Sequence, residues 1–211
     1  MHHLSTIVFA FCLSLTSLGQ SLHYDAIRKE KVIGGMDILI QFSGDDRIYD
    51  IKSHMEFKVL LVSLRVEFEN HEIFHNDVLQ SGMVRNKMIG FKESEAKIEK
   101  TNDRYNLWIN GTPEPIHDKE ITYSVSNIYT QEPHDGQKVF SQYYGEYFVF
   151  EKIGAHEYKY TSSEGDNFYT YLNGICTDVK VERDFATIYF RLQPESLSAV
   201  KNNASQFLNN D

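Results

Sequence analysis

The residues with the most recognisable chemical spacing lie at positions 71–75, which read His-Glu-Ile-Phe-His. This order matches the H-E-x-x-H signature of zinc proteases, in which two histidines bind the metal and the glutamate is the general base. That chemistry needs an α-helix, because helical positions i and i+4 stand about 6 Å apart on one face. On a β-strand the same two histidines would be about 13 Å apart and could not share an ion. Whether His71 and His75 bind zinc therefore depends on the element that carries them.

The segment that carries these histidines, residues 47–75, has a period of two. Apolar or small side chains occupy every second position, at Tyr49, Ile51, Ser53, Met55, Phe57 and Val59, with polar residues between them. The phase slips at 60–63, and Leu64, Val66 and Phe68 carry the apolar face onward. This period places alternate side chains on opposite faces of an extended strand. We therefore predict one long extended segment and reject His71 and His75 as metal ligands.

Aromatic residues in the second half of the chain are the candidates for ligand binding. Tyrosine rings could line an amphipathic groove, and they could equally pair across strands and pack a core. The candidates are Tyr147, Tyr158, Tyr160, Tyr169 and Tyr171. We identify no catalytic residue, and no motif in the sequence indicates a cofactor.

The remaining elements predict a mainly β protein. Alternating segments at 22–27, 32–42, 78–88, 91–99 and 104–109 precede six further strands between 138 and 192, most of them separated by turn residues. A helical stripe at 122–131 predicts one short helix with Thr122 as its N-cap, although a strand would also fit. Long strands need long neighbours, so we expect a large curved antiparallel meander, an open or half-closed barrel with one or two short helices.

The N-terminal residues predict export. An apolar run at 4–18 is followed by small residues at Ser17 and Gly19, which fits a signal peptide over residues 1–19. Fifteen apolar residues are too few for a membrane span, which takes about 20. We expect a single β domain over 20–193 and an amphipathic helix or tail over 194–211, in a periplasmic or extracellular protein with no transmembrane segment in the mature chain.

The net charge of −9 limits the partners. Nucleic acid binding requires a basic surface, so we expect no nucleic acid partner. The charge sum also gives no reason for adhesion to anionic lipid headgroups.

Most of the mature chain resembles a bacterial family of exported envelope proteins, domain of unknown function family 6134. The resemblance rests on turns and core positions: Tyr24-Asp25-Ala26 with Val32-Ile33-Gly34, residues 74–79 with Asp77 where glycine is usual, Ser124-Val125 with Ile128-Tyr129 and Pro133, Val139-Phe140-Ser141 with Gly145, residues 169–174, and Tyr189-Phe190-Arg191-Leu192. The family implies no catalytic residue. More distantly, the expected fold is similar to the half-barrels of lipoprotein carriers, which shelter acyl chains.

These observations favour a non-enzymatic binding protein whose concave face shelters an apolar small molecule or lipid. One alternative is a structural or interaction protein with a filled core. A second is a zinc-dependent hydrolase using residues 71–75. An outer-membrane barrel would share the alternation, but the abundant charges and the polar ending at 209–211 disfavour it.

Overall fold

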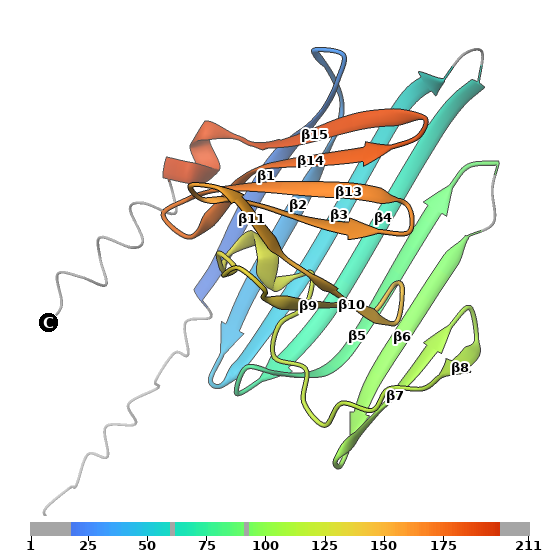
Figure 1. Ribbon diagram of the computed structural model, residues 1–211, viewed down its shortest axis with the longest axis vertical. Helices are drawn as coiled ribbons and strands as arrows, with labels where there is room; N and C mark the ends of the chain where they lie inside the picture. Colours follow the sequence, from blue (N-terminus) through green and yellow to red (C-terminus); the bar gives the residue numbers. More distant parts are fainter. Residues whose placement is uncertain (1–17, 60–61, 91–92, 199–211) are drawn as a thin grey trace, which may run out of the picture.

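An open antiparallel sheet of 13 strands forms most of this protein (Figure 1). The computed structural model describes residues 18–59, 62–90 and 93–198. The order in the large sheet is β11-β12-β13-β14-β15-β1-β2-β3-β4-β5-β6-β7-β8, and β9 and β10 form a separate two-stranded sheet. The strands are β1 (Leu18–Arg28), β2 (Lys31–Ser43), β3 (Asp46–Val59), β4 (Val62–His75), β5 (Val78–Met88), β6 (Ser94–Thr101), β7 (Arg104–Ile109), β8 (Thr112–Glu114), β9 (Lys138–Ser141), β10 (Glu146–Val149), β11 (Glu151–Gly154), β12 (Glu157–Ser162), β13 (Gly165–Leu172), β14 (Ile175–Arg183) and β15 (Ala186–Leu192). The mainly β class and the antiparallel meander are confirmed.

The predicted continuity of the segment 47–75 is wrong. The chain reverses between β3 and β4, and the two strands pair as a hairpin in which Asp46 lies opposite His75 and Val59 opposite Val62. The phase slip at 60–63 marks this reversal; residues 60–61 lie outside the described ranges. A straight strand of this length would extend about 95 Å, whereas a hairpin satisfies its backbone hydrogen bonds locally. The extended conformation and the alternation of faces are confirmed.

The large sheet bends so that β12–β15 lie over the concave side of β2–β5 (Figure 1). Strand β1 joins these two halves, because it pairs with β2 on one side and with β15 on the other. The β9–β10 hairpin lies between the two ends of the sheet. Its turn residue Gly145 lies against the side chains of Leu107 and Ile109 in β7, and Phe148 in β10 stacks on Tyr160 in β12 at 5.0 Å. The architecture is therefore an open, half-closed barrel whose gap is bridged by a hairpin.

The predicted helix over 122–131 is mostly wrong. Only a 3-10 turn, η1 (Asn127–Tyr129), forms there, and its N-cap is Ser126 in place of Thr122. Ser124 instead makes a bridge to Phe140 in β9, because backbone pairing with that hairpin outweighs a short helical stripe. As expected, this segment crosses the concave face of the sheet.

The C-terminal amphipathic helix was expected over 194–211. Residues 194–198 are helical, and the Ser196 hydroxyl accepts a 3.0 Å hydrogen bond from the His23 backbone N–H. The rest of that prediction lies outside the described residues, as do residues 1–17 of the signal peptide expected over 1–19. Its last two residues, Leu18 and Gly19, belong to β1. No helix in the described part of the chain is long and apolar enough to cross a membrane.

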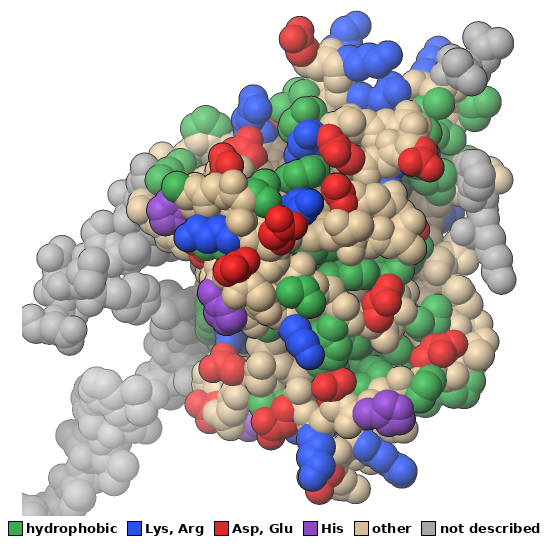
Figure 2. Space-filling model, viewed as in Figure 1, with side chains coloured by type: hydrophobic (Ala, Val, Ile, Leu, Met, Phe, Trp, Pro, Cys, Tyr) green, Lys and Arg blue, Asp and Glu red, His purple; other side chains and the backbone are tan. Residues whose placement is uncertain are grey.

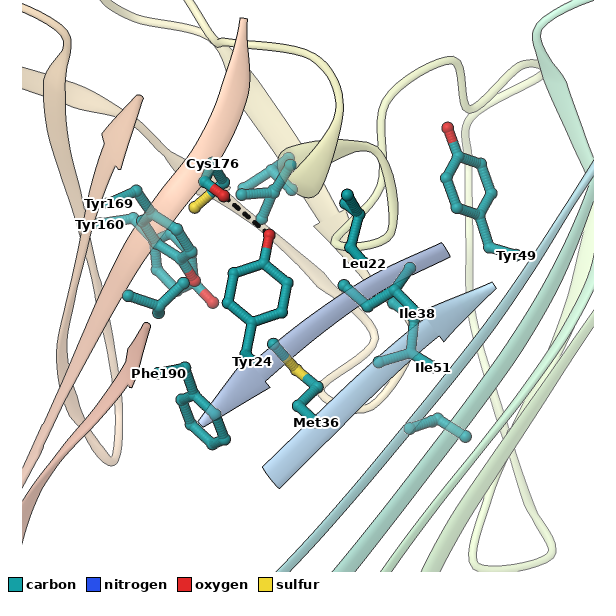
Figure 3. Close-up of a cluster of buried hydrophobic side chains, with 14 of the residues drawn as sticks. Leu22, Tyr24, Met36, Ile38, Tyr49, Ile51, Tyr160, Tyr169, Cys176 and Phe190 are labelled. Atoms are coloured by element: carbon teal, nitrogen blue, oxygen red, sulfur yellow. Dashed lines mark hydrogen bonds between the residues drawn. The ribbon is translucent and has the colours of Figure 1, made fainter. Parts of the chain in front are cut away.

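The core lies between the two halves of the bent sheet (Figure 3). Leu22, Tyr24 and Ile38 from β1 and β2 are almost completely buried. The Tyr24 hydroxyl reaches across this core and donates a 2.7 Å hydrogen bond to the carbonyl oxygen of Cys176 in β14. One polar contact thus ties the first strand to the opposite layer.

Candidate functional site

A cavity of about 650 Å³ lies on the concave face of the sheet. Strands β2–β5 form its floor, and strands β12–β15 together with η1 and the β9–β10 hairpin form its opposite wall. The period of two explains this floor. In β3, Ile51, Ser53, Met55 and Phe57 all face the cavity, while His54 and its polar neighbours are exposed on the outer face.

The strand register arranges the floor in cross-strand rows. The middle row contains Met36, Ser53, Phe68, Asn86 and Ser94, which are successive partners from β2 to β6. The next row, toward the β3–β4 turn, contains Met55, Val66 and Met88 and is wholly apolar. The floor therefore offers a few neutral polar groups among thioether, aliphatic and aromatic surface, as small-molecule pockets usually do.

Aromatic rings form part of the wall opposite this floor. Tyr160 and Tyr169 stack with ring centroids 5.6 Å apart, and both line the cavity. Figure 3 shows both rings on the far side of the core cluster from Ile51. Burial raises the pKa of both phenols, so each stays a neutral hydrogen-bonding group at physiological pH.

The other predicted tyrosines lie away from the cavity. Tyr147 packs against Phe140 at 5.2 Å, and Tyr158 packs against Tyr171 at 5.8 Å. Tyr129 also lines the cavity and was not among the predicted candidates. Its position in η1 gives no local signal, because only the path of that segment over the sheet brings it to the cavity.

A buried polar network closes one end of the cavity. Asn70 and Gln142 line the cavity there; the Gln142 side-chain N–H donates to Asn70 Oδ1, and Asn70 donates to Ser126 Oγ at 2.8 Å. Two residues further along β4, Glu72 is completely buried and accepts a hydrogen bond from the Ser124 hydroxyl. Burial raises the pKa of Glu72 and outweighs the opposing hydrogen bonds. This network anchors the crossing segment to β4.

The two histidines of the H-E-x-x-H match lie on the outer face of β4. His71 Nδ1 is 2.7 Å from Asp50 Oδ1, and His75 Nδ1 is 2.7 Å from Asp46 Oδ1, both across the β3–β4 hairpin. Glu72 between them points to the opposite face. The helix that a zinc protease requires is replaced by a strand, so the zinc-hydrolase alternative is wrong for this motif. Within 18–59, 62–90 and 93–198, no three His, Cys, Asp or Glu side chains are grouped to hold a metal ion.

Among the described residues, the charged side chains that line the cavity lie near two neighbouring turns. They are Glu164 in the β12–β13 turn and Arg183 and Asp184 at the β14–β15 turn. Arg183 Nη2 donates to Asn167 Oδ1 at 3.1 Å, and Arg183 Nε lies 3.7 Å from Glu164 Oε2. The Arg183 cation is thereby paired within the protein.

A comparison with protein families identifies a match to most of the chain. The model described as "Domain of unknown function (DUF6134)" matches residues 24–193. No curated protein and no solved structure matches the chain.

Proposed function

The chain belongs to the family described as Domain of unknown function (DUF6134), and from its cavity we propose that it is an exported, non-enzymatic protein that binds an apolar or acyl ligand. The observation that carries this proposal is a cavity of about 650 Å³ where a filled sheet interior would leave none. Pockets for small ligands are typically about 300–1,000 Å³.

The chemistry of the lining supports an apolar ligand. Met36, Met55 and Met88 supply flexible thioether side chains, which adapt to irregular apolar shapes. The charged lining residues are confined to the β12–β13 and β14–β15 turns, so an apolar chain deeper in the cavity would meet neutral side chains. A polar end of the ligand would meet neutral amides and phenols such as Asn70, Gln142 and Tyr160.

A plugging variant tests the proposal. A chain starting at Gln20 is titrated with a fluorescent acyl-chain probe, and native mass spectrometry of the same protein detects ligand that co-purifies. Ser53→Phe places a ring in the middle row of the floor and is expected to weaken probe binding at least tenfold. His54→Phe adds the same ring to the outer face of β3 and is the matched control. Equal binding by both variants, or no binding by the unmodified protein, would instead favour the filled-core alternative.

Export is tested separately. The apolar run at 4–18 and the small residues before Gln20 support cleavage after Gly19. N-terminal sequencing of protein recovered outside the cytoplasm of a secreting host is expected to begin at Gln20. After cleavage, residues 20–28 of β1 would still pair with residues 31–40 of β2. Recovery of uncleaved protein only from the cytoplasm would contradict export and leave the ligand proposal intact.

A further inference from the structure

Three hairpin turns meet at one end of the large sheet. The register places Gly34 of β2 beside Met55 of β3, and Val66 of β4 beside Met88 of β5. The β1–β2, β3–β4 and β5–β6 turns therefore lie at the same edge (Figure 1). We call this edge the turn end.

Two turns of the turn end, β1–β2 and β3–β4, are basic although the whole chain is acidic. Their cations are Arg28, Lys29, Lys31, Lys58 and Arg65, against Glu30 and Glu56, and Glu56 pairs with Arg65 at 3.1 Å. The remaining charges are nearly balanced: Lys87 lies opposite Glu67, Glu93 pairs with Arg85 at 3.0 Å, and Asp184 precedes Phe185. Figure 2 shows Lys and Arg side chains gathered at the end where Figure 1 places the β1–β2 turn.

The same turns, together with the β14–β15 turn beside them, expose large apolar side chains. Val32 is 65% exposed and Val62 is 59% exposed, and Ile89 and Phe185 expose nearly half of their surface. These residues come from four different turns or strand ends. Contact with water or with phosphate does not stabilise exposed apolar side chains. Apolar side chains among cations therefore favour a partner that has both an apolar region and a negatively charged surface.

Acidic residues gather at the turns of the opposite end. Asp45 and Asp46 lie at the β2–β3 turn, Asp77 at the β4–β5 turn, where Arg47 pairs with it, and Asp103 at the β6–β7 turn, next to Arg104. The net charge of −9 is therefore spread unevenly over the sheet. An anionic surface would attract the turn end and repel the other, which orients the molecule.

The cavity extends to the turn end. Phe57 and Met88, at the ends of β3 and β5, both line it. The Arg28 guanidinium lies 5.0 Å from the centre of the Phe57 ring and donates a 2.9 Å hydrogen bond to the carbonyl oxygen of Lys58. Basic surface and cavity wall are thus in direct contact.

We infer that the turn end docks on an anionic lipid bilayer. The cations bind lipid headgroups, and Val32, Val62, Ile89 and Phe185 enter the interface between headgroups and acyl chains. This places the cavity next to the bilayer, where an acyl ligand can pass without crossing water. A nucleic acid partner would use the cations but would leave the aliphatic side chains in water. The inference extends the proposed function by a partner, but docking itself does not require an occupied cavity.

Vesicle sedimentation tests the docking. The unmodified protein is expected to bind phosphatidylcholine vesicles that contain phosphatidylglycerol, to bind pure phosphatidylcholine weakly, and to dissociate as salt is added. Each lysine near an anionic surface contributes about 1 kcal/mol, so Lys29→Ala/Lys31→Ala should lower the partition coefficient about 30-fold. Val62→Asp should lower it further, because it replaces the inserted group with a repelled one.

The matched control removes two exposed cations from the opposite end. Arg104→Ala/Lys119→Ala has the same net charge as the double lysine variant and should bind vesicles as the unmodified protein does. An equal loss in both variants, or binding to duplex DNA without binding to vesicles, would overturn the inference. The acyl-probe titration keeps the two proposals apart: a protein that binds probe but not vesicles refutes docking alone, and the reverse result refutes the carrier alone.

Discussion

The hydroxyl of Ser124 donates a hydrogen bond to the carboxyl group of Glu72, and neither residue exposes any surface to solvent. Glu72 lies on the inner face of β4 and Ser124 on the segment that crosses it, 52 residues further along the chain. The contact therefore holds the crossing segment against the sheet with a buried acid.

Glu72 should make stability depend on pH. Burial raises its pKa in the folded state, so the unfolded chain ionises first, near pH 4.3, while the folded protein keeps the proton. The free energy of unfolding then falls as pH rises from that point until the folded pKa is reached, by up to about 1.4 kcal/mol per pH unit. Glu72→Gln removes this loss and retains an acceptor for Ser124. We expect the variant to gain stability over the unmodified protein between pH 4 and 7 in urea titrations.

Glu67→Gln controls for the lost charge, since Glu67 lies on the exposed outer face of the same strand. If the Glu72→Gln difference stays constant over this pH range, the carboxyl is ionised in the folded protein and the argument from burial is wrong.

Gly82 should not tolerate a side chain. It is the cross-strand partner of Glu72, and a Cβ atom there would overlap with Oε1 of Gln142. Gln142 is fully buried and bonded to Asn70, so it has little room to move. Gly82→Ala is expected to cost about 1–3 kcal/mol of unfolding free energy, measured by denaturant titration.

A double-mutant cycle identifies the cause. In a Gln142→Ala background the overlapping atom is gone, so adding Gly82→Ala should cost little. Additive losses would place the strain elsewhere in the sheet.

Local periodicity predicted the sheet because it depends only on neighbouring residues. The outward histidines, the inward Met55 and the extended form of β3 and β4 all follow from alternation. The polar network does not, since Glu72 meets Ser124 only through the path of a distant segment. Alternation also cannot show where a strand reverses, so it predicts one continuous strand over 47–75 in place of the β3–β4 hairpin.

A charge sum does not show how the charges are distributed. The value of −9 argues against nucleic acid and gives no reason for adhesion to lipid headgroups, whereas strand register places Lys29 and Lys58 at one end and Asp45 and Asp46 at the other. Only the pairing of strands separates these groups in space. Of the five predicted tyrosines, Tyr160 and Tyr169 line the cavity. Tyr158, on the same strand as Tyr160, packs against Phe150 and Tyr171 instead.

Removing the Tyr24 hydroxyl should weaken the contact between the two layers. Tyr24 is 1% exposed, and its partner is the carbonyl oxygen of fully buried Cys176. Tyr24→Phe leaves that acceptor without the phenol and is expected to cost about 1–3 kcal/mol in urea titrations. Tyr189→Phe, which removes a hydroxyl from an exposed ring on β15, should change stability by no more than about 0.5 kcal/mol. Similar losses of unfolding free energy in both variants would show that the buried hydrogen bond of Tyr24 contributes no more to stability than the exposed hydroxyl of Tyr189.

The thiol of Cys176 reports on the same layer contact. Burial raises its pKa, and a chain starting at Gln20 contains no other cysteine. A thiol reagent such as dithiobis-nitrobenzoate should therefore leave the folded protein unlabelled and label one thiol per chain in denaturant. Because labelling requires opening, Tyr24→Phe should speed it about tenfold for each 1.4 kcal/mol of stability lost. Rapid labelling of the folded protein would mean that β14 separates from the core without global unfolding, and an unchanged rate in Tyr24→Phe would mean that the two layers open independently of the Tyr24 bond.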